Sequence, residues 1–226
     1  MEGFAKLCFQ VCGSGFRWSN SRLQIQSSMI ETPVKVSGIN SLTDARYCAG
    51  MGVQYLGIQF NDLTKTLSPL EFKSIRAWIE GIEWVGEYGG NSAEELKKLA
   101  AEYELQFWEI GQISLAAELK NEGFRLGFKL ENPTDVIPDH RLFEYLSMPW
   151  SVKDSATSSA GLIGFQTTEI PILFSGISSI ADLRRAMEQY PGYGFHFQSG
   201  EEERPGWMDL SALQDMLEVL EDLLKP

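Results

Sequence analysis

The sequence predicts a single-domain (β/α)8 barrel, and three observations lead to this fold class. The chain has 226 residues, a length at which such barrels occur as one domain. Strand-like and helix-like segments alternate along it, and eight strand-like segments can be counted. Residues 34–60 form a compact strand–helix–strand unit, which usually makes parallel neighbours. An open doubly wound sheet is the alternative, although no glycine-rich dinucleotide-binding motif follows the first strand.

The opening unit reads VKVSGINSLTDARYCAGMGVQYLGIQF. Its first strand is a short β-branched run that stops at Ser37. Asn40 or Ser41 is placed to cap a helix, because either side chain can accept a hydrogen bond from an exposed N–H group of the first turn. Apolar residues then recur at helical spacing as far as Gly50. The apolar, partly alternating run over 53–60 is expected to be the second strand.

The same alternation continues to the C-terminus. Further strands are expected over residues 84–88, 105–110, 124–130, 149–153, 170–174 and 193–198. Helices are expected over 69–82, 93–104, 114–123, 141–146, 181–189 and, after a cap at Asp209, as far as 224. Asn91 or Ser92 is placed to cap the second of these helices, and Ser178 or Ser179 the fifth. Residues 155–164, SATSSAGLIG, are small and polar, so the sixth helix is expected to be short or missing. We expect the segment EEERPGW to be a loop.

Residues 1–32 lack any sustained period, since polar and basic residues interrupt their apolar groups. We predict that they are an N-terminal extension, either disordered or upstream of the true start, for which Met29 is a candidate. Lys6 interrupts the only candidate for the apolar part of a signal peptide. We predict that residues 33–226 are the barrel domain.

Composition narrows the class of protein. With 43% hydrophobic and 22% charged residues, it is that of an ordinary soluble globular protein, and a cytoplasmic location is expected. No apolar run approaches the length of a membrane span. The formal charge of −12 argues against broad nucleic-acid binding. Three cysteines and two histidines have no metal-ligand spacing, so we expect no metal; Cys48 reads as a small core residue.

Active sites of such barrels lie at the C-terminal ends of the strands. The residues expected there are Lys35, Ser37, Gln59, Glu87, Trp108, Glu109, Lys129, Glu131, Lys153, Asp154, Ser175, Gly176 and residues 198–200. The last two strands both end in Ser-Gly, and small residues there let backbone N–H groups approach an anion. We therefore predict a phosphate site at Ser175, Gly176, Ile177, Ser199 and Gly200. Ordinary turn chemistry is the alternative.

Other strand-end residues have a functional and a structural interpretation. Asp154 follows a predicted strand and precedes a loop of small residues, so it is the candidate acid or base, or else a solvated turn residue. Trp108 could stack on a ring of the substrate, or simply pack. Lys35 and Lys65 are candidate anion contacts, or else solvated surface charges.

From Pro33 onward the chain resembles phosphoribosylanthranilate isomerases. VKVSGINSLTDA is similar to the opening family motif K-I/V-C-G-I/L with a downstream D-A. LGIQF is similar to the family's second strand, LSPLEF to its second helix start, and VGEYGGNSAEEL to its third strand and the helix that follows. FQSGEEERPGWMDLSAL is similar to its phosphate-binding end. The resemblance implies a barrel-shaped isomerase of tryptophan biosynthesis that uses neither metal nor organic cofactor.

The family reaction is an Amadori rearrangement of N-(5-phosphoribosyl)anthranilate. A general acid opens the ribose ring, and a general base removes the C2′ proton. The resemblance implies that Asp154 is the acid, and it places Ser37 where the family has its general-base cysteine. A thiol of ordinary pKa about 8.5 can be tuned toward the thiolate near neutrality, whereas an aliphatic hydroxyl has no comparable access to its anion.

Further positions depart from the family pattern. Trp108 stands in place of a histidine, His196 in place of an aspartate and Lys65 in place of an arginine. Lysine keeps the charge at this last position but loses bidentate geometry. The resemblance thus makes Lys35, Lys65 and Trp108 the expected substrate contacts, with the phosphate-binding end closer to the family than the proton-transfer residues.

Two functions follow from this comparison of motifs. The first is an isomerase acting on N-(5-phosphoribosyl)anthranilate or a related phosphosugar amine. The second is a catalytically impaired paralogue that binds a phosphosugar or serves as an interaction module. Both imply a small phosphosugar as partner, and neither nucleic acid nor membrane. Monomer and homodimer both remain open.

Overall fold

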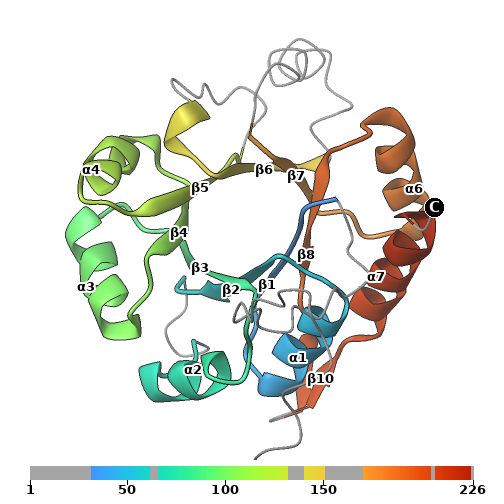
Figure 1. Cartoon of the computed structure of the whole chain (residues 1–226), viewed down its shortest axis with the longest axis horizontal. Coiled ribbons are helices and arrows are strands. Elements are labelled where there is room, and N and C mark those ends of the chain that lie inside the picture. The colour runs from blue at the N-terminus through green and yellow to red at the C-terminus, as the bar shows by residue number, and fades with distance from the viewer. Residues whose placement is uncertain (1–31, 62–65, 132–139, 151–169, 205–206, 225–226) are drawn as a thin grey trace, which may run out of the picture.

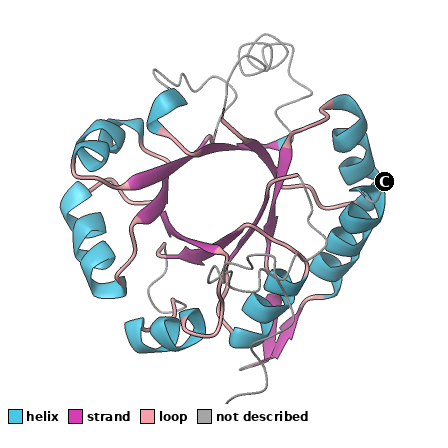
Figure 2. Cartoon of the chain, in the orientation of Figure 1, coloured by secondary structure: helices cyan, strands magenta, loops and turns pink. Residues whose placement is uncertain are grey.

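The structure is a computed structural model that describes residues 32–61, 66–131, 140–150, 170–204 and 207–224. Within them, eight parallel strands close into a barrel in the order β1 to β8. Figure 1 looks along the barrel and shows the strands as a ring with helices around it. Figure 2 separates this inner ring from the outer helices by colour. The predicted fold class is confirmed, and the alternative of an open sheet is wrong.

The strands of the barrel are short. They are β1 Val34–Ser37, β2 Tyr55–Gln59, β3 Glu83–Tyr88, β4 Phe107–Ile110, β5 Arg125–Lys129, β6 Tyr145–Pro149, β7 Ile172–Ser175 and β8 Gly194–Gln198. The α-helices of the described residues are α1 Leu42–Gly50, α2 Pro69–Arg76, α3 Ala93–Tyr103, α4 Ala116–Asn121, α6 Ile180–Gln189 and α7 Ser211–Leu224. Two 3-10 turns, η1 Ile113–Leu115 and η2 His140–Leu142, complete the outer layer.

Serine caps start four of these helices. Ser41, Ser68, Ser92 and Ser179 each accept a hydrogen bond from the backbone N–H three residues further on. Such a cap satisfies a donor that the helix itself leaves without a partner. Of the two candidate caps of α1, Asn40 and Ser41, the structure has Ser41.

The first and last strands of the barrel meet where β8 pairs with β1. Lys35 lies opposite His196 in this register, and Ser37 lies opposite Gln198. Beyond the strands, the Ser199 N–H donates to the Ser37 carbonyl at 2.7 Å. Barrel closure therefore places residues from opposite ends of the sequence side by side.

Alternation along the strands separates two cores. Outward residues such as Val34 and Val36 pack beneath the helices in the main hydrophobic core. Inward residues of the central strands include a smaller apolar cluster of Val85, Phe107, Tyr145 and Leu173, with Tyr55 packed against it. In β1 the inward positions carry Lys35 and Ser37 instead, so the barrel interior changes from apolar to polar along its axis.

The prediction for the sixth strand is wrong by about four residues. Residues 149–153 were expected to form it, yet β6 is Tyr145–Pro149, and the expected helix over 141–146 is reduced to η2. The first four residues of β6 are buried, because one set faces the barrel interior and the other faces the helices. An apolar run that is buried on both faces shows no alternation that distinguishes it from a buried helix.

Another difference follows β8. The expected loop EEERPGW contains a short antiparallel pair, β9 Glu201–Arg204 with β10 Trp207–Asp209, and α7 begins only at Ser211. The predicted absence or shortness of the sixth helix falls on residues 151–169, outside the described part of the chain, as does nearly all of the predicted extension over 1–32. No helix in the described residues has the length and apolar character needed to cross a membrane.

Candidate active site

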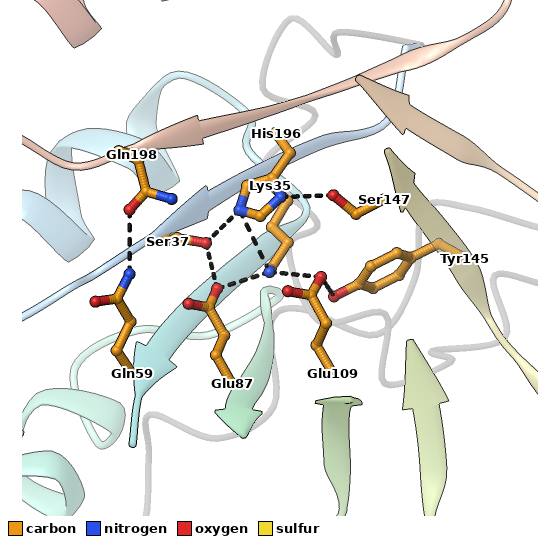
Figure 3. Close-up of polar contacts among 9 residues, drawn as sticks. All are labelled: Lys35, Ser37, Gln59, Glu87, Glu109, Tyr145, Ser147, His196 and Gln198. Carbon is orange, nitrogen blue, oxygen red and sulfur yellow. Dashed lines mark hydrogen bonds and ion pairs between the residues drawn. The ribbon is translucent and has the colours of Figure 1, made fainter. Parts of the chain in front are cut away.

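A cluster of buried polar side chains lies inside the barrel, toward the C-terminal ends of the strands. We call it the interior polar cluster; its members are Lys35, Ser37, Glu87, Glu109, Tyr145, Ser147 and His196 (Figure 3). They come from β1, β3, β4, β6 and β8, so the closed barrel is what brings them together. Active sites of this fold occupy the same end of the barrel.

Lys35 lies at the centre of the cluster and is fully buried. Its Nζ atom is 2.6 Å from Glu87 Oε1 and 2.8 Å from Glu109 Oε2. Burial lowers the pKa of Lys35, but the two carboxylates together outweigh it and hold the pKa above its ordinary value. The charged form of Lys35 is therefore favoured, and the ammonium lies between the two glutamate side chains.

Ser37 connects the lysine group to His196. Its hydroxyl contacts both Glu87 Oε1 and His196 Nε2, while Ser147 Oγ is 2.8 Å from His196 Nδ1. Burial, with the Lys35 ammonium nearby, holds the pKa of His196 well below its ordinary value. The imidazole is therefore neutral, and both of its nitrogens are engaged.

Tyr145 hydrogen-bonds to Glu109, the second carboxylate partner of Lys35. Its hydroxyl donates to Glu109 Oε2 at 2.9 Å, while its ring packs in the apolar part of the interior. Burial, reinforced by the charges of Glu109 and Glu87, raises the pKa of Tyr145 well above its ordinary value. The phenol thus remains protonated and acts as a hydrogen-bond donor.

Two inward-facing glycines make room for these large side chains. A Cβ atom at Gly57 would lie 2.0 Å from Glu87 Oε1, and one at Gly127 would lie 2.5 Å from the Tyr145 ring. Distances that short exclude any side chain unless the neighbour moves. The glycines of β2 and β5 therefore leave the space that the Glu87 carboxylate and the Tyr145 ring occupy.

Three members of the cluster have the donor types of a metal site. Ligand atoms of Glu87, Glu109 and His196 all lie within 4.8 Å of one another, and all three residues are buried. However, Lys35 Nζ lies within 3.4 Å of an atom of each of them. The ammonium thus supplies the positive charge that a metal would supply, from within the chain.

An amide pair lies beside the end of β1. Gln59 Nε2 donates to Gln198 Oε1 at 3.1 Å, and both residues are exposed. They extend from the strands on either side of β1, and Figure 3 shows them beyond Ser37. These side chains offer amide donors and acceptors to a polar ligand at this end of the barrel.

The residues predicted to bind phosphate lie at the ends of β7 and β8. Ser175 is opposite His196 in the strand register, Gly176 is exposed with a φ of +75°, and the Ile177 side chain belongs to the hydrophobic core. Ser199 hydrogen-bonds within the chain, since its hydroxyl donates to the Gly38 carbonyl at 2.6 Å. The structure thus brings these residues together at neighbouring strand ends, and their role with phosphate stays a prediction.

Trp108 and Lys35 were expected to contact a substrate, but in the structure both make contacts with other residues of the protein. Trp108 is fully buried between the barrel and the helices, packs on Phe60 and donates its indole N–H to the Leu105 carbonyl at 3.0 Å. It points outward because its neighbours in β4, Phe107 and Glu109, point inward. Lys35 is enclosed by the interior polar cluster, so the alternative of a solvated surface charge is wrong.

The remaining predicted residues, Lys65 and Asp154, lie outside the described residues. The strand that was expected to end just before Asp154 instead ends at Pro149. Sequence reasoning missed Tyr145 because it fell in an expected helix, and Ser147 because it fell between that helix and the expected sixth strand. Glu87 and Glu109 were placed at strand ends but given no role; a charged residue at an inward position of a barrel strand is the signal that identifies them.

A titration tests the electrostatic description of His196. Because its folded-state pKa is depressed, we expect its ring signals in NMR to stay those of neutral imidazole as the pH falls through the ordinary value of about 6.5. The associated stability is present above the unfolded value of about 6.5 and is lost as the pH falls below it. His196→Gln identifies the signals by their disappearance. A midpoint near 6.5 for these signals would contradict the description.

Comparison with known proteins gives matches to solved structures. No family model and no curated protein matches the sequence. The phosphoribosylanthranilate isomerase of Thermus thermophilus superposes with a TM-score of 0.64 at 20% identity, over 85% of this chain and 100% of that chain. The corresponding enzyme of Thermotoga maritima gives 0.64 at 19% identity, over 85% and 100%.

A third structure is a phosphoribosylanthranilate isomerase in complex with reduced 1-(o-carboxyphenylamino)-1-deoxyribulose 5-phosphate. It superposes with a TM-score of 0.65 at 18% identity, over 84% of this chain and 99% of that chain. Identities this low show the fold alone. The fold is thus that of the solved isomerases to which the sequence motifs pointed, and the match extends over nearly the whole length of each of these three structures.

Proposed function

We propose that this protein is an intramolecular aldose–ketose isomerase that acts on N-(5-phosphoribosyl)anthranilate or a related phosphosugar amine. The reaction is the Amadori rearrangement, and tryptophan biosynthesis in the cytoplasm is part of the same proposal. One observation carries it: around Ser37, at the end of β1, acidic and basic groups are assembled inside a barrel with the fold of these isomerases.

The reaction needs a proton donor, a proton acceptor and an anchor for the phosphate. The strand ends with Ser175, Gly176 and Gly200 are the proposed anchor, because backbone N–H groups beside small residues can approach an anion closely. Asp154, which follows β6 in the sequence, is the proposed acid for ring opening. The interior polar cluster is the proposed source of the acceptor. No metal is required for this chemistry, since the transfers involve protons only.

The test is turnover by the purified protein. Incubation with N-(5-phosphoribosyl)anthranilate should yield the ribulose-type ketone, and Asp154→Asn should reduce kcat by roughly 10²-fold or more, the usual contribution of a positioned acid. Growth of a tryptophan auxotroph lacking this isomerase gives an independent readout of the same activity. Ser37→Cys is the informative companion variant, because it restores the thiol of the family motif.

Each outcome leads to a different conclusion. Turnover by the wild-type protein supports the isomerase. Absence of turnover, together with a raised melting temperature in the presence of the reduced product analogue, would instead support the second candidate, a paralogue that binds a phosphosugar without catalysis. The complete burial of Ser37 is the observation that favours this second candidate. If neither turnover nor a shift in melting temperature is found, both functions are wrong.

A further inference from the structure

The hydrogen-bond donors of Lys35 determine the state of its neighbours. An ammonium has three N–H donors and no acceptor. Three acceptor atoms lie around Lys35 Nζ: Glu87 Oε1 at 2.6 Å, Glu109 Oε2 at 2.8 Å and His196 Nε2 at 3.4 Å. We therefore assign the imidazole proton of His196 to Nδ1, which then donates to Ser147 Oγ at 2.8 Å and leaves Nε2 as an acceptor. The neutral imidazole is consistent with this tautomer.

Counting hydrogen-bond donors and acceptors in the same way defines the role of Ser37. Its hydroxyl touches a carboxylate oxygen of Glu87 and the unprotonated Nε2 of His196, and both of these atoms are acceptors. Its single proton is thus donated to one or the other. Ser37 is held as a donor within the cluster, so its oxygen is not a base comparable to the thiolate of the family it resembles.

Exposure distinguishes the two carboxylates. The Glu87 side chain is 10% exposed, whereas that of Glu109 is 3% exposed and that of Lys35 is 0% exposed. Glu87 is also the acidic partner of Ser37, and its carboxylate lies against the Cβ position of Gly57. Within the interior polar cluster, Glu87 is therefore the carboxylate that contacts Ser37, and its side chain is the more exposed of the two.

We propose that Glu87 is the catalytic base of the isomerase, and that its carboxylate replaces the missing thiolate. The proposal rests on the proposed function. The C2–H bond of the substrate iminium breaks, and its proton passes to a Glu87 oxygen. The electron pair of that bond forms the C1–C2 double bond, while the C1–N π electrons return to nitrogen. Lys35 and Ser37 are positioning residues that hold the carboxylate by ion pair and hydrogen bond.

Variants of Glu87 test the assignment. Glu87→Gln keeps the shape of the side chain and an oxygen that can accept from Ser37, but it cannot take a proton. We expect kcat to fall by roughly 10²-fold or more with little change in KM, because a general base contributes about that much to the rate. Exchange of the C2 hydrogen with solvent deuterium should be lost in parallel.

Chemical rescue separates a base from a structural residue. In Glu87→Ala, added formate or acetate should restore part of kcat, because a small carboxylate can enter the space left by the side chain. Glu109→Ala is the matched control: it also removes one anionic partner of Lys35 but not the partner of Ser37, so formate should not raise its rate. Circular dichroism and melting curves establish that both variants fold.

The results distinguish this proposal from the proposed function. If the wild type turns over while Glu87→Gln retains kcat within about twofold, the isomerase stands and Glu87 is not its base, since a general base contributes far more than that. Equal rescue of Glu87→Ala and Glu109→Ala would also overturn the assignment. A wild-type protein without any turnover would refute both proposals together.

Discussion

Replacing Lys35 with methionine is expected to destabilise the folded protein by about 3–5 kcal/mol, the usual cost of removing one partner from a buried ion pair. Methionine approximates the length of the lysine side chain, so the change removes the charge with little loss of volume. Glu87 and Glu109 would then remain buried without the ammonium that lies 2.6 and 2.8 Å from their oxygens. Urea unfolding monitored by tryptophan fluorescence measures the difference.

The pH dependence of this effect has a definite sign. The folded-state pKa of Lys35 is raised, so its stabilisation is complete below the unfolded value of about 10.4 and is lost only as the pH rises through the folded value. Across the neutral range the wild type should therefore keep this contribution.

A set of matched variants tests whether unbalanced buried charge causes the loss of stability. Adding Glu87→Gln and Glu109→Gln to Lys35→Met removes the repulsion and should recover most of the lost stability. Lys73→Met is the surface control, since Lys73 pairs with Glu104 at 3.2 Å but its side chain is 70% exposed; exposed pairs contribute little. If Lys35→Met were no less stable than Lys73→Met, the buried ion pairs would not support the fold.

The sequence was sufficient for the barrel because the fold is a repetition of one unit. Each strand carries its own apolar run, and serines such as Ser41 and Ser179 mark where helices begin, so local signals agree with the global architecture. The sixth strand was misplaced where this agreement fails. There both faces are buried, and period-2 alternation is lost.

The candidate site was predicted only in part, for a different physical reason. Ser37 was found from its motif, but its partners His196 and Glu87 are separated from it by 159 and 50 residues. The ion pairs of Lys35 depend on strand register and barrel closure, which no local pattern records. Trp108 illustrates how the facing of a side chain depends on its position in the strand. Trp108 faces the helices, whereas Glu109, the next residue of β4, faces the barrel interior.

Substituting Gly57 with alanine is expected to displace the Glu87 carboxylate, because the new Cβ atom would lie 2.0 Å from Oε1 and 3.2 Å from the Ser37 Cα atom. Overpacking of a well-filled interior typically costs about 1–3 kcal/mol. Glu87 cannot simply rotate away, since Lys35 and Ser37 both hold the same oxygen. We therefore expect a lower free energy of unfolding and, if the protein is the proposed isomerase, a large loss of kcat.

A double-mutant cycle identifies the cause of that loss. Combining Gly57→Ala with Glu87→Ala removes the atoms that clash. The free energy of unfolding of the double mutant should therefore exceed, by about 1–3 kcal/mol, the value expected from adding the two single effects. Gly127→Ala serves as the comparison, because its Cβ meets the Tyr145 ring at 2.5 Å rather than Glu87. Its cost should be unchanged when Glu87→Ala is added. Additive effects in the Gly57 cycle would mean that Glu87 does not occupy the space beside Gly57.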